Sequence, residues 1–328
     1  MKESNLPAQE LKTVRDFIRW GASYLGQAKL TYGHGTDNAL DEAACLVLHA
    51  VHLPHDIPDH FLDGVLTQTE RQKVLELLQD RVATRRPAAY LIHEAWFAGL
   101  RFYVDESVLV PRSPLAELIG NNLAPWVEEG RVRHILDLCT GSGCIGIACA
   151  VAFPDAWVDA VDISPEALSV ARRNVAAHHL EDRVRIIQSD LFTSLDDSTY
   201  DVIISNPPYV PHNVMAELDK EYRHEPALGL VAGEDGLDII RRILSDAAAY
   251  LNEDGVLIVE VGDSQEMVLQ QYPEIPFLWL GWLKSLPGVS GPGHLTDPPS
   301  NRCRAPRIES SRPFLGTRGG CWIRCPRR

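Results

Sequence analysis

The stretch His134–Gly146, His-Ile-Leu-Asp-Leu-Cys-Thr-Gly-Ser-Gly-Cys-Ile-Gly, decides the fold class of this 328-residue chain. It begins with a short apolar run, His134–Leu138, that is typical of a buried strand. A glycine-rich turn, Cys139–Gly146, follows, and the apolar residues Ile147–Phe153 open a helix. A strand, a glycine-rich turn and a helix in this order indicate a parallel sheet with helices on both faces.

The same alternation continues along the chain and makes the predicted fold class α/β, with a Rossmann-like sheet. Four further runs rich in apolar and β-branched residues predict strands: Trp157–Val161, which ends at Asp162, Val184–Gln188, which ends near Asp190, Asp201–Ser205 and Gly255–Val261. Two helices are predicted between them, Pro165–His178 with Ser164 as its N-cap and Leu237–Leu251.

The region before this sheet, from about residue 11 to 86, has helical periodicity and almost no strand signal. It predicts a small bundle of three helices. The first has Leu11, Val14, Phe17, Ile18 and Leu25 on one face; the second is Asn38–His52, capped by Thr36 or Asp37; the third begins at Thr67 or Thr69 and continues through Val82.

A connector joins the bundle to the sheet. Its pattern predicts two short strands within Ala95–Val110, joined at Gly99 or Asp105, and then a helix over Leu115–Trp126. The expected organisation is a helical substrate-recognition domain (1–90), a β-hairpin connector (91–115), a ligand-binding α/β domain (116–280) and an atypical tail (281–328).

Composition limits the partners and the compartment. The net charge is −14, but residues 281–328 hold 9 Lys and Arg against 2 Asp and Glu, so the remainder holds 22 against 43. An acidic body disfavours a nucleic-acid backbone as the main partner and favours a basic protein. The first residues lack an apolar signal core, no run is long enough to span a membrane, and the seven cysteines suggest reduced thiols. We therefore expect a cytoplasmic protein without a membrane partner.

The tail from residue 281 departs from the pattern of the sheet. It contains 7 Pro, 7 Gly and 3 Cys in 48 residues and has no usable periodicity. This composition predicts disorder. If the tail supplies no closing strand, the sheet is left with an exposed edge.

Four histidines, His49, His52, His55 and His60, lie close together in the helical region. Imidazoles three residues apart share a helix face and are suitable metal ligands. The helix should break at Pro54, however, and no cysteine or carboxylate completes a ligand set. We expect no metal here.

The glycine-rich turn is also a candidate ligand loop. Gly141–Gly146 has the form G-x-G-x-x-G, and Asp162 follows about 20 residues later, where a carboxylate can bind ribose hydroxyls. Asp190, at the end of the next strand, adds an acceptor where an adenine amino group would lie. The motif alone does not distinguish a dinucleotide from S-adenosylmethionine.

The four residues Asn206-Pro207-Pro208-Tyr209 follow the strand Asp201–Ser205 and favour a methyl donor. The prolines fix φ near −65° and give a stiff corner. The Asn206 side-chain carbonyl and the Pro207 backbone carbonyl would accept both hydrogens of a planar NH2 group, and Tyr209 would cover its face. A plain strand terminator is the alternative interpretation of these four residues. No residue stands out as the acid–base partner that a nicotinamide enzyme needs.

Together the segments DLCTGSGCIG, VDIS, SDLF and NPPYV resemble the class I S-adenosylmethionine-dependent methyltransferases. The segments EYRHEPALGLVAGEDGLDIIRRIL and AAYLIHEAWFAGLRFYVDESVLVPRSP are similar to the protein-(glutamine-N5) methyltransferases. With TYGHGTDNALDEAACLVLHAVHLP included, the branch that acts on ribosomal protein uL3 is the most similar. This resemblance covers about residues 11–280.

The resemblance implies a role for each matching residue. S-adenosylmethionine would be bound by a loop and two strand ends, comprising Asp137, Cys139, Thr140, Gly141, Ser142 and Gly143 at the methionine side, Asp162 at the ribose, and Asp190 and Leu191 at the adenine. The glutamine amide would be bound by Asn206, Pro207, Pro208 and Tyr209, with Asn206 also beside the methyl donor. Cys139 stands where many methyltransferases have glycine, and we interpret it as an inert thiol.

Three alternatives remain beside methylation of uL3. The first is a release-factor glutamine methyltransferase, which differs only in the protein recognised. The second is a DNA or RNA amino-methyltransferase, which the acidic body disfavours. The third is a non-catalytic binding module for ribosome assembly.

Overall fold

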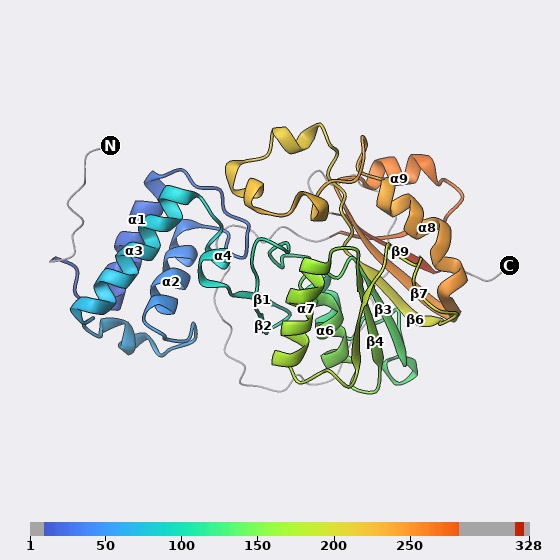
Figure 1. Ribbon diagram of the computed structural model, residues 1–328, viewed down its shortest axis with the longest axis horizontal. Coiled ribbons are helices and arrows are strands. Elements are labelled where there is room, and N and C mark those ends of the chain that lie inside the picture. Colours follow the sequence, from blue (N-terminus) through green and yellow to red (C-terminus); the bar gives the residue numbers. More distant parts are fainter. Residues whose placement is uncertain (1–9, 282–318, 325–328) are drawn as a thin grey trace.

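The computed structural model describes residues 10–281 and 319–324. Figure 1 shows a helical unit beside an α/β unit, with a short hairpin between them. Within the described residues, no helix combines the length and the apolar character needed to cross a bilayer.

The α/β unit is built on one seven-stranded sheet in the order β5-β4-β3-β6-β7-β9-β8. The strands β3 to β7 are parallel, and β9 is antiparallel to both of its neighbours. The chain order reverses between β3 and β6, the position where open α/β sheets bind ligands. The strands are β3 (His134–Leu138), β4 (Trp157–Asp162), β5 (Val184–Gln188), β6 (Tyr200–Ser205), β7 (Leu251–Gly262), β8 (Leu278–Gly281) and β9 (Gly319–Arg324).

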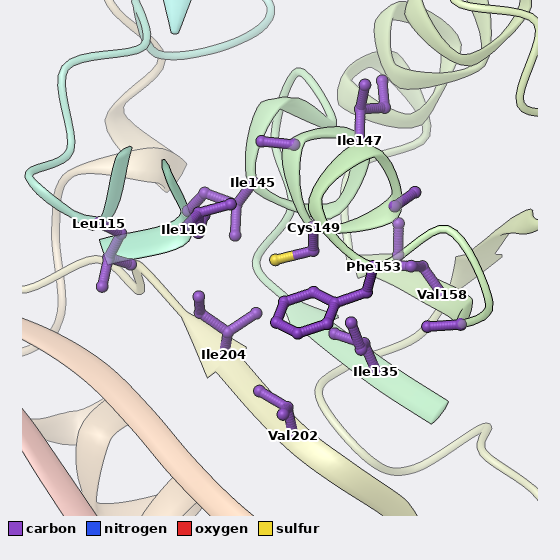
Figure 2. Close-up of a cluster of buried hydrophobic side chains, with 14 of the residues drawn as sticks. Leu115, Ile119, Ile135, Ile145, Ile147, Cys149, Phe153, Val158, Val202 and Ile204 are labelled. Carbon is purple, nitrogen blue, oxygen red and sulfur yellow. The ribbon is translucent and has the colours of Figure 1, made fainter. Parts of the chain in front are cut away.

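Helices cover both faces of this sheet, as the sequence predicts (Figure 1). One face packs against α5 (Leu115–Gly120), α6 (Cys144–Ala152) and α7 (Pro165–Ala177), and the other against α8 (Asp238–Tyr250) and α9 (Gln265–Gln271). Figure 2 shows Cys149 and Phe153 beside the sheet residues Ile135, Val202 and Ile204. Alternate residues of each central strand contribute to opposite cores, which explains why these strands are apolar throughout.

Strand β9 changes the expectation for the C-terminal tail. Most of residues 281–328 lies outside the described part of the chain, so the predicted disorder is not addressed there. Gly319–Arg324, however, pairs with β7 on one side and β8 on the other. The described backbone therefore supplies an antiparallel strand to the sheet. Strand β7 is paired on that side and is not an exposed edge.

The helical unit contains the three predicted helices, followed by a short fourth helix and a hairpin. Thr67 caps α3, one of the two residues predicted for that position. Asn38 caps α2, in place of Thr36 or Asp37, because its side-chain oxygen accepts from the backbone N–H groups two and three residues later. The elements are α1 (Val14–Gln27), α2 (Ala39–Ala50), α3 (Gln68–Thr84), α4 (Ala88–Ile92), β1 (Ala95–Phe97) and β2 (Leu100–Phe102).

Of the two predictions made for the connector, the hairpin agrees with the structure and the length of the helix does not. The hairpin turns at Gly99, which has φ of +76° and open space around it, so this prediction is confirmed. The helix predicted over Leu115–Trp126 is wrong in length, because α5 ends at Gly120. Asn122 and Leu123 both take left-handed backbone conformations, which a right-handed helix does not allow.

Buried charges join the helical unit to the segment that follows β6. Arg81, fully buried on α3, donates to Glu42 of α2 at 2.7 Å and lies 3.9 Å from Glu221. Glu221 also pairs with Arg85 at 2.7 Å and accepts from the backbone N–H of Thr31. This network fixes the 221–225 segment against the helical unit, because any separation would leave buried charges without their partners.

We expect Arg81→Ala to lower the free energy of unfolding by about 3–5 kcal/mol, since Glu42 and Glu221 lose a buried cation. Urea denaturation followed by circular dichroism measures this loss. The matched control is Arg19→Ala, which removes an exposed arginine from the same helical unit. Equal effects of the two substitutions would contradict the role of the buried network.

Candidate active site

A cavity of about 290 Å³ opens at the carboxyl ends of the central strands. Its position follows from the pairing of β3 with β6, in which Leu138 lies opposite Ser205. The Ser205 hydroxyl also donates to the Leu138 carbonyl at 2.8 Å. Neighbouring strands are about 4.8 Å apart, so the segments beginning at Cys139 and Asn206 emerge side by side.

The glycine-rich loop after β3 is shaped by three left-handed residues at alternate positions, with φ of 59° at Cys139, 55° at Gly141 and 82° at Gly143. A β-carbon on Gly141 would meet nothing within 4 Å, so this side of the loop is open to a ligand. The left-handed backbone at Cys139 explains why many methyltransferases have glycine at this position, since glycine adopts this conformation without strain. Burial raises the pKa of the Cys139 thiol, consistent with an inert role.

Asp137 lies at the end of β3, fully buried beneath the loop. Its Oδ2 accepts from the Thr140 hydroxyl and from the Gly146 backbone N–H, which closes the loop around it. Its Oδ1 is buried and has no hydrogen-bond partner. Burial raises the pKa of Asp137 to about 7, and the two hydrogen bonds oppose this shift only in part.

Asp162 ends β4 and faces the same cavity. One carboxylate oxygen accepts from the Gly141 N–H at 2.9 Å and the other from the Ser164 N–H at 3.0 Å. Burial raises the pKa of this carboxyl, against the effect of those backbone donors. Asp162 therefore fixes the glycine-rich loop and still borders the cavity with a hydrogen-bond acceptor.

Asp190, at the end of the segment after β5, forms an ion pair with Arg242 of α8 at 2.9 Å. Both side chains are half-exposed at the cavity wall. The neighbouring Leu191 is buried and takes a left-handed conformation. The adenine role expected for Asp190 and Leu191 stays a prediction.

The corner Asn206–Tyr209 borders the same cavity as the loop. Pro207 is buried, whereas Asn206 and Tyr209 are partly exposed. The Tyr209 hydroxyl donates to Glu260 of β7 at 3.1 Å. The corner is thus a rigid edge with an amide and an aromatic ring exposed to the same space as the loop.

All but two of the predicted site residues border this one cavity, the exceptions being Asp137 and Gly143. Sequence reasoning missed other residues of its wall, which include Val108–Ser113 of the connector, Pro226, Leu228–Val231, Arg242 and Glu260. A signal for Glu260 was present, because a charged residue inside an apolar strand is rarely buried unless it is paired.

The sheet order and the loop at the end of β3 define a class I methyltransferase fold, and residues 119–220 match the family model "Methyltransferase small domain". A protein called ribosomal protein uL3 glutamine methyltransferase in Bordetella pertussis is 52% identical over 278 residues, covering 84% of this chain and 93% of its own. A protein of the same name from Neisseria meningitidis serogroup B is 50% identical over 277 residues, covering 84% and 91%. The chain belongs to the ribosomal protein uL3 glutamine methyltransferase family, which confirms the resemblance predicted from sequence.

Membership of this class implies a methyl donor of the S-adenosylmethionine type. The cavity fits such a group in two respects. Asp162 presents a hydrogen-bond acceptor, and Gly141 leaves open space at the loop.

The raised pKa of Asp137 makes a pH dependence testable. The folded carboxyl binds its proton more tightly than the unfolded one, so the stability it contributes is complete below about pH 4 and is lost as pH rises through about 7. The free energy of unfolding of the wild-type protein should therefore fall by about 2–4 kcal/mol between pH 5 and pH 8, and we expect this fall to be absent in Asp137→Asn. Urea unfolding of the donor-free protein at both pH values measures it. The exposed Asp182→Asn is the control; identical pH slopes in both variants would refute the prediction.

A second prediction concerns the left-handed Cys139. We expect Cys139→Gly to raise the free energy of unfolding by about 0.5–1 kcal/mol. Glycine relieves the left-handed strain, and the larger entropy of glycine in the unfolded chain offsets only part of that gain. Cys139→Val should instead destabilise the fold, since β-branched residues disfavour this conformation. Thermal unfolding of both variants gives the comparison, and a destabilised glycine variant would contradict it.

Proposed function

We propose that this chain methylates the side-chain nitrogen of a glutamine in ribosomal protein uL3, with S-adenosylmethionine as methyl donor. One observation carries the proposal: the glycine-rich loop and the Asn206–Tyr209 corner border the same cavity. The corner supplies a site for a carboxamide, and the loop supplies a site for the donor. The names of the relatives supply the identity of the substrate.

The donor would be held by the loop and by the ends of β3, β4 and the segment after β5. Asp137 and the loop residues Cys139–Gly143 would bind its methionine part, Asp162 its ribose, and Asp190-Leu191 its adenine. When bound, S-adenosylmethionine supplies an electrophilic methyl group on a sulfonium sulfur. The residues of the chain would hold the acceptor nitrogen in line with that group.

The corner would bind the glutamine amide through its two N–H groups. The Asn206 side-chain oxygen and the Pro207 carbonyl accept one hydrogen each, and Tyr209 lies beside the amide plane. An amide nitrogen is a poor nucleophile because its lone pair is delocalised, so orientation is the main requirement. Positioning of this kind lowers a barrier by about 7–11 kcal/mol in favourable cases. The nitrogen would form a bond to the methyl carbon as the carbon–sulfur bond breaks and leaves a neutral thioether. The methylated amide would then release its proton to solvent, so no strong base is required.

Recognition of the protein substrate would involve the N-terminal domain (1–90), whose described residues form the helical unit. The 221–225 segment is anchored to this unit by Glu221, and Glu225 binds Arg112 of the connector at 2.7 Å. The residues that follow, Pro226 and Leu228, border the cavity, and Leu228 is 57% exposed. The helical unit is thus connected directly to one wall of the site. The acidic body favours a basic partner such as a ribosomal protein.

Two substitutions should separate the two halves of the site. Asn206→Ala is expected to abolish turnover while the affinity for the donor persists, because it removes an acceptor for the amide. Asp162→Ala is expected chiefly to weaken the binding of the donor. Calorimetric titration with S-adenosylmethionine and an assay with labelled methyl groups measure the two effects. Parallel loss of both quantities in Asn206→Ala would count against the assignment.

The substrate is tested by incubating the protein with labelled donor and, separately, with purified uL3, a release factor, DNA and RNA. Label on a uL3 glutamine supports the proposal, and mass spectrometry locates it. Label on the release factor or on a nucleic acid assigns the corresponding alternative. Stable binding to uL3 without methyl transfer would make the chain a binding module.

A further inference from the structure

Glu260 is a buried carboxylate that the proposed chemistry leaves unexplained. Only 4% of the residue is exposed, and it lies in the apolar strand β7. Val259 of β7 pairs with Ser205, the last residue of β6, so Glu260 follows this pair on β7 and Asn206 follows it just past the end of β6. The carboxylate therefore stands at the level of the amide-binding corner, and it borders the cavity.

Both oxygens of this carboxylate accept from hydroxyl groups. Oε1 accepts from Tyr209 at 3.1 Å, and Oε2 accepts from Ser113 at 2.6 Å. The Ser113 oxygen in turn accepts from the Leu115 backbone N–H at the start of α5. Glu260 thus links the Asn206–Tyr209 corner to the connector, two segments almost 100 residues apart along the chain (113 and 209).

The backbone around Tyr209 is shaped to hold the ring in one place. A β-carbon on Gly262, two residues after Glu260, would lie 2.5 Å from the Tyr209 ring. A β-carbon on Gly236 would lie 2.3 Å from the Tyr209 carbonyl oxygen. Strand β7 therefore gives the ring its space through Gly262 and fixes its hydroxyl through Glu260.

We propose that Glu260 is a positioning residue for methyl transfer, which acts by fixing the Tyr209 ring beside the bound carboxamide. The inference rests on the proposed function, since it deepens the role of the same corner. The hydrogen bond to Glu260 holds the phenolic oxygen of Tyr209 in place, so it limits swinging of the ring away from the corner. The aromatic wall is then in place before the glutamine enters, and the nitrogen meets the donor in one orientation.

The informative variant is Glu260→Met, which removes both acceptors and keeps an unbranched side chain of similar length. Because the buried Ser113 hydroxyl then loses its acceptor, thermal unfolding first verifies that this variant is folded. We expect kcat to fall by about 10²-fold, the loss that a small misplacement of a reacting group causes. The affinity for S-adenosylmethionine should stay unchanged. Glu260→Gln, which retains one acceptor, should recover most of the turnover.

A double-mutant cycle tests whether the effect passes through Tyr209. Tyr209→Phe should lower kcat by a similar factor, and the double variant Glu260→Met with Tyr209→Phe should be no slower than either single variant. Multiplicative losses would show that Glu260 acts independently of the ring and would overturn the inference. An unchanged kcat in Glu260→Met, or a loss of donor affinity that matches the loss of turnover, would overturn it as well.

A spectroscopic measurement separates this inference from the proposed function. With 3-fluorotyrosine at position 209, the fluorine resonance should move in Glu260→Met and stay close to its original position in Glu260→Gln. Glu253→Met, an exposed position on the same strand, is the matched control and should leave it unchanged. If wild-type protein methylates no substrate, the proposed function fails, and the resonance still reports the contact. A resonance that does not respond to Glu260→Met would refute the inference.

Discussion

The pairing of two neighbouring strands, β3 and β6, is the constraint on which the rest of the site depends. Because Leu138 lies opposite Ser205, the glycine-rich loop and the proline-rich corner emerge at the same height on adjacent strands. A shift of one residue would turn the side chains of β6 to the other face. It would also move Asn206 away from the loop. The apolar cores on both sides of the sheet hold this register, since Ile204 and Ile203 pack into opposite clusters.

Around this centre, buried polar contacts connect segments that are distant in the chain. Glu260 links the corner to the connector, and Glu221 links the segment after the corner to the helical unit. Such contacts are costly when one partner is lost. They therefore fix the walls of the cavity more strictly than apolar packing would. A rigid cavity suits a reaction whose main requirement is the orientation of a weak nucleophile.

Most of the sheet could be predicted from local pattern. His134–Leu138 and Val184–Gln188 were predicted with the bounds that the structure has, because short apolar runs flanked by turn residues leave little ambiguity. Prediction was weaker where left-handed residues ended an element, as in α5, whose apolar pattern continues past Gly120. Strand β9 was missed because it lies in a segment rich in glycine and proline. Its pairing with β7 and β8, which lie far from it in the chain, leaves no local pattern.

The sequence by itself determined the chemistry that the site contains: a glycine-rich loop, acidic strand ends and a proline-locked amide, all recognisable as local motifs. The tertiary structure alone decided which distant residues complete the site. Nothing in the local sequence around Glu260, Ser113 and Arg242 shows that these residues reach the cavity. They do so only through the pairing of β7 with β6 and the packing of the connector and α8. The physical reason is that a motif acts through neighbouring residues, whereas a cavity wall is built by contacts between segments far apart in the chain.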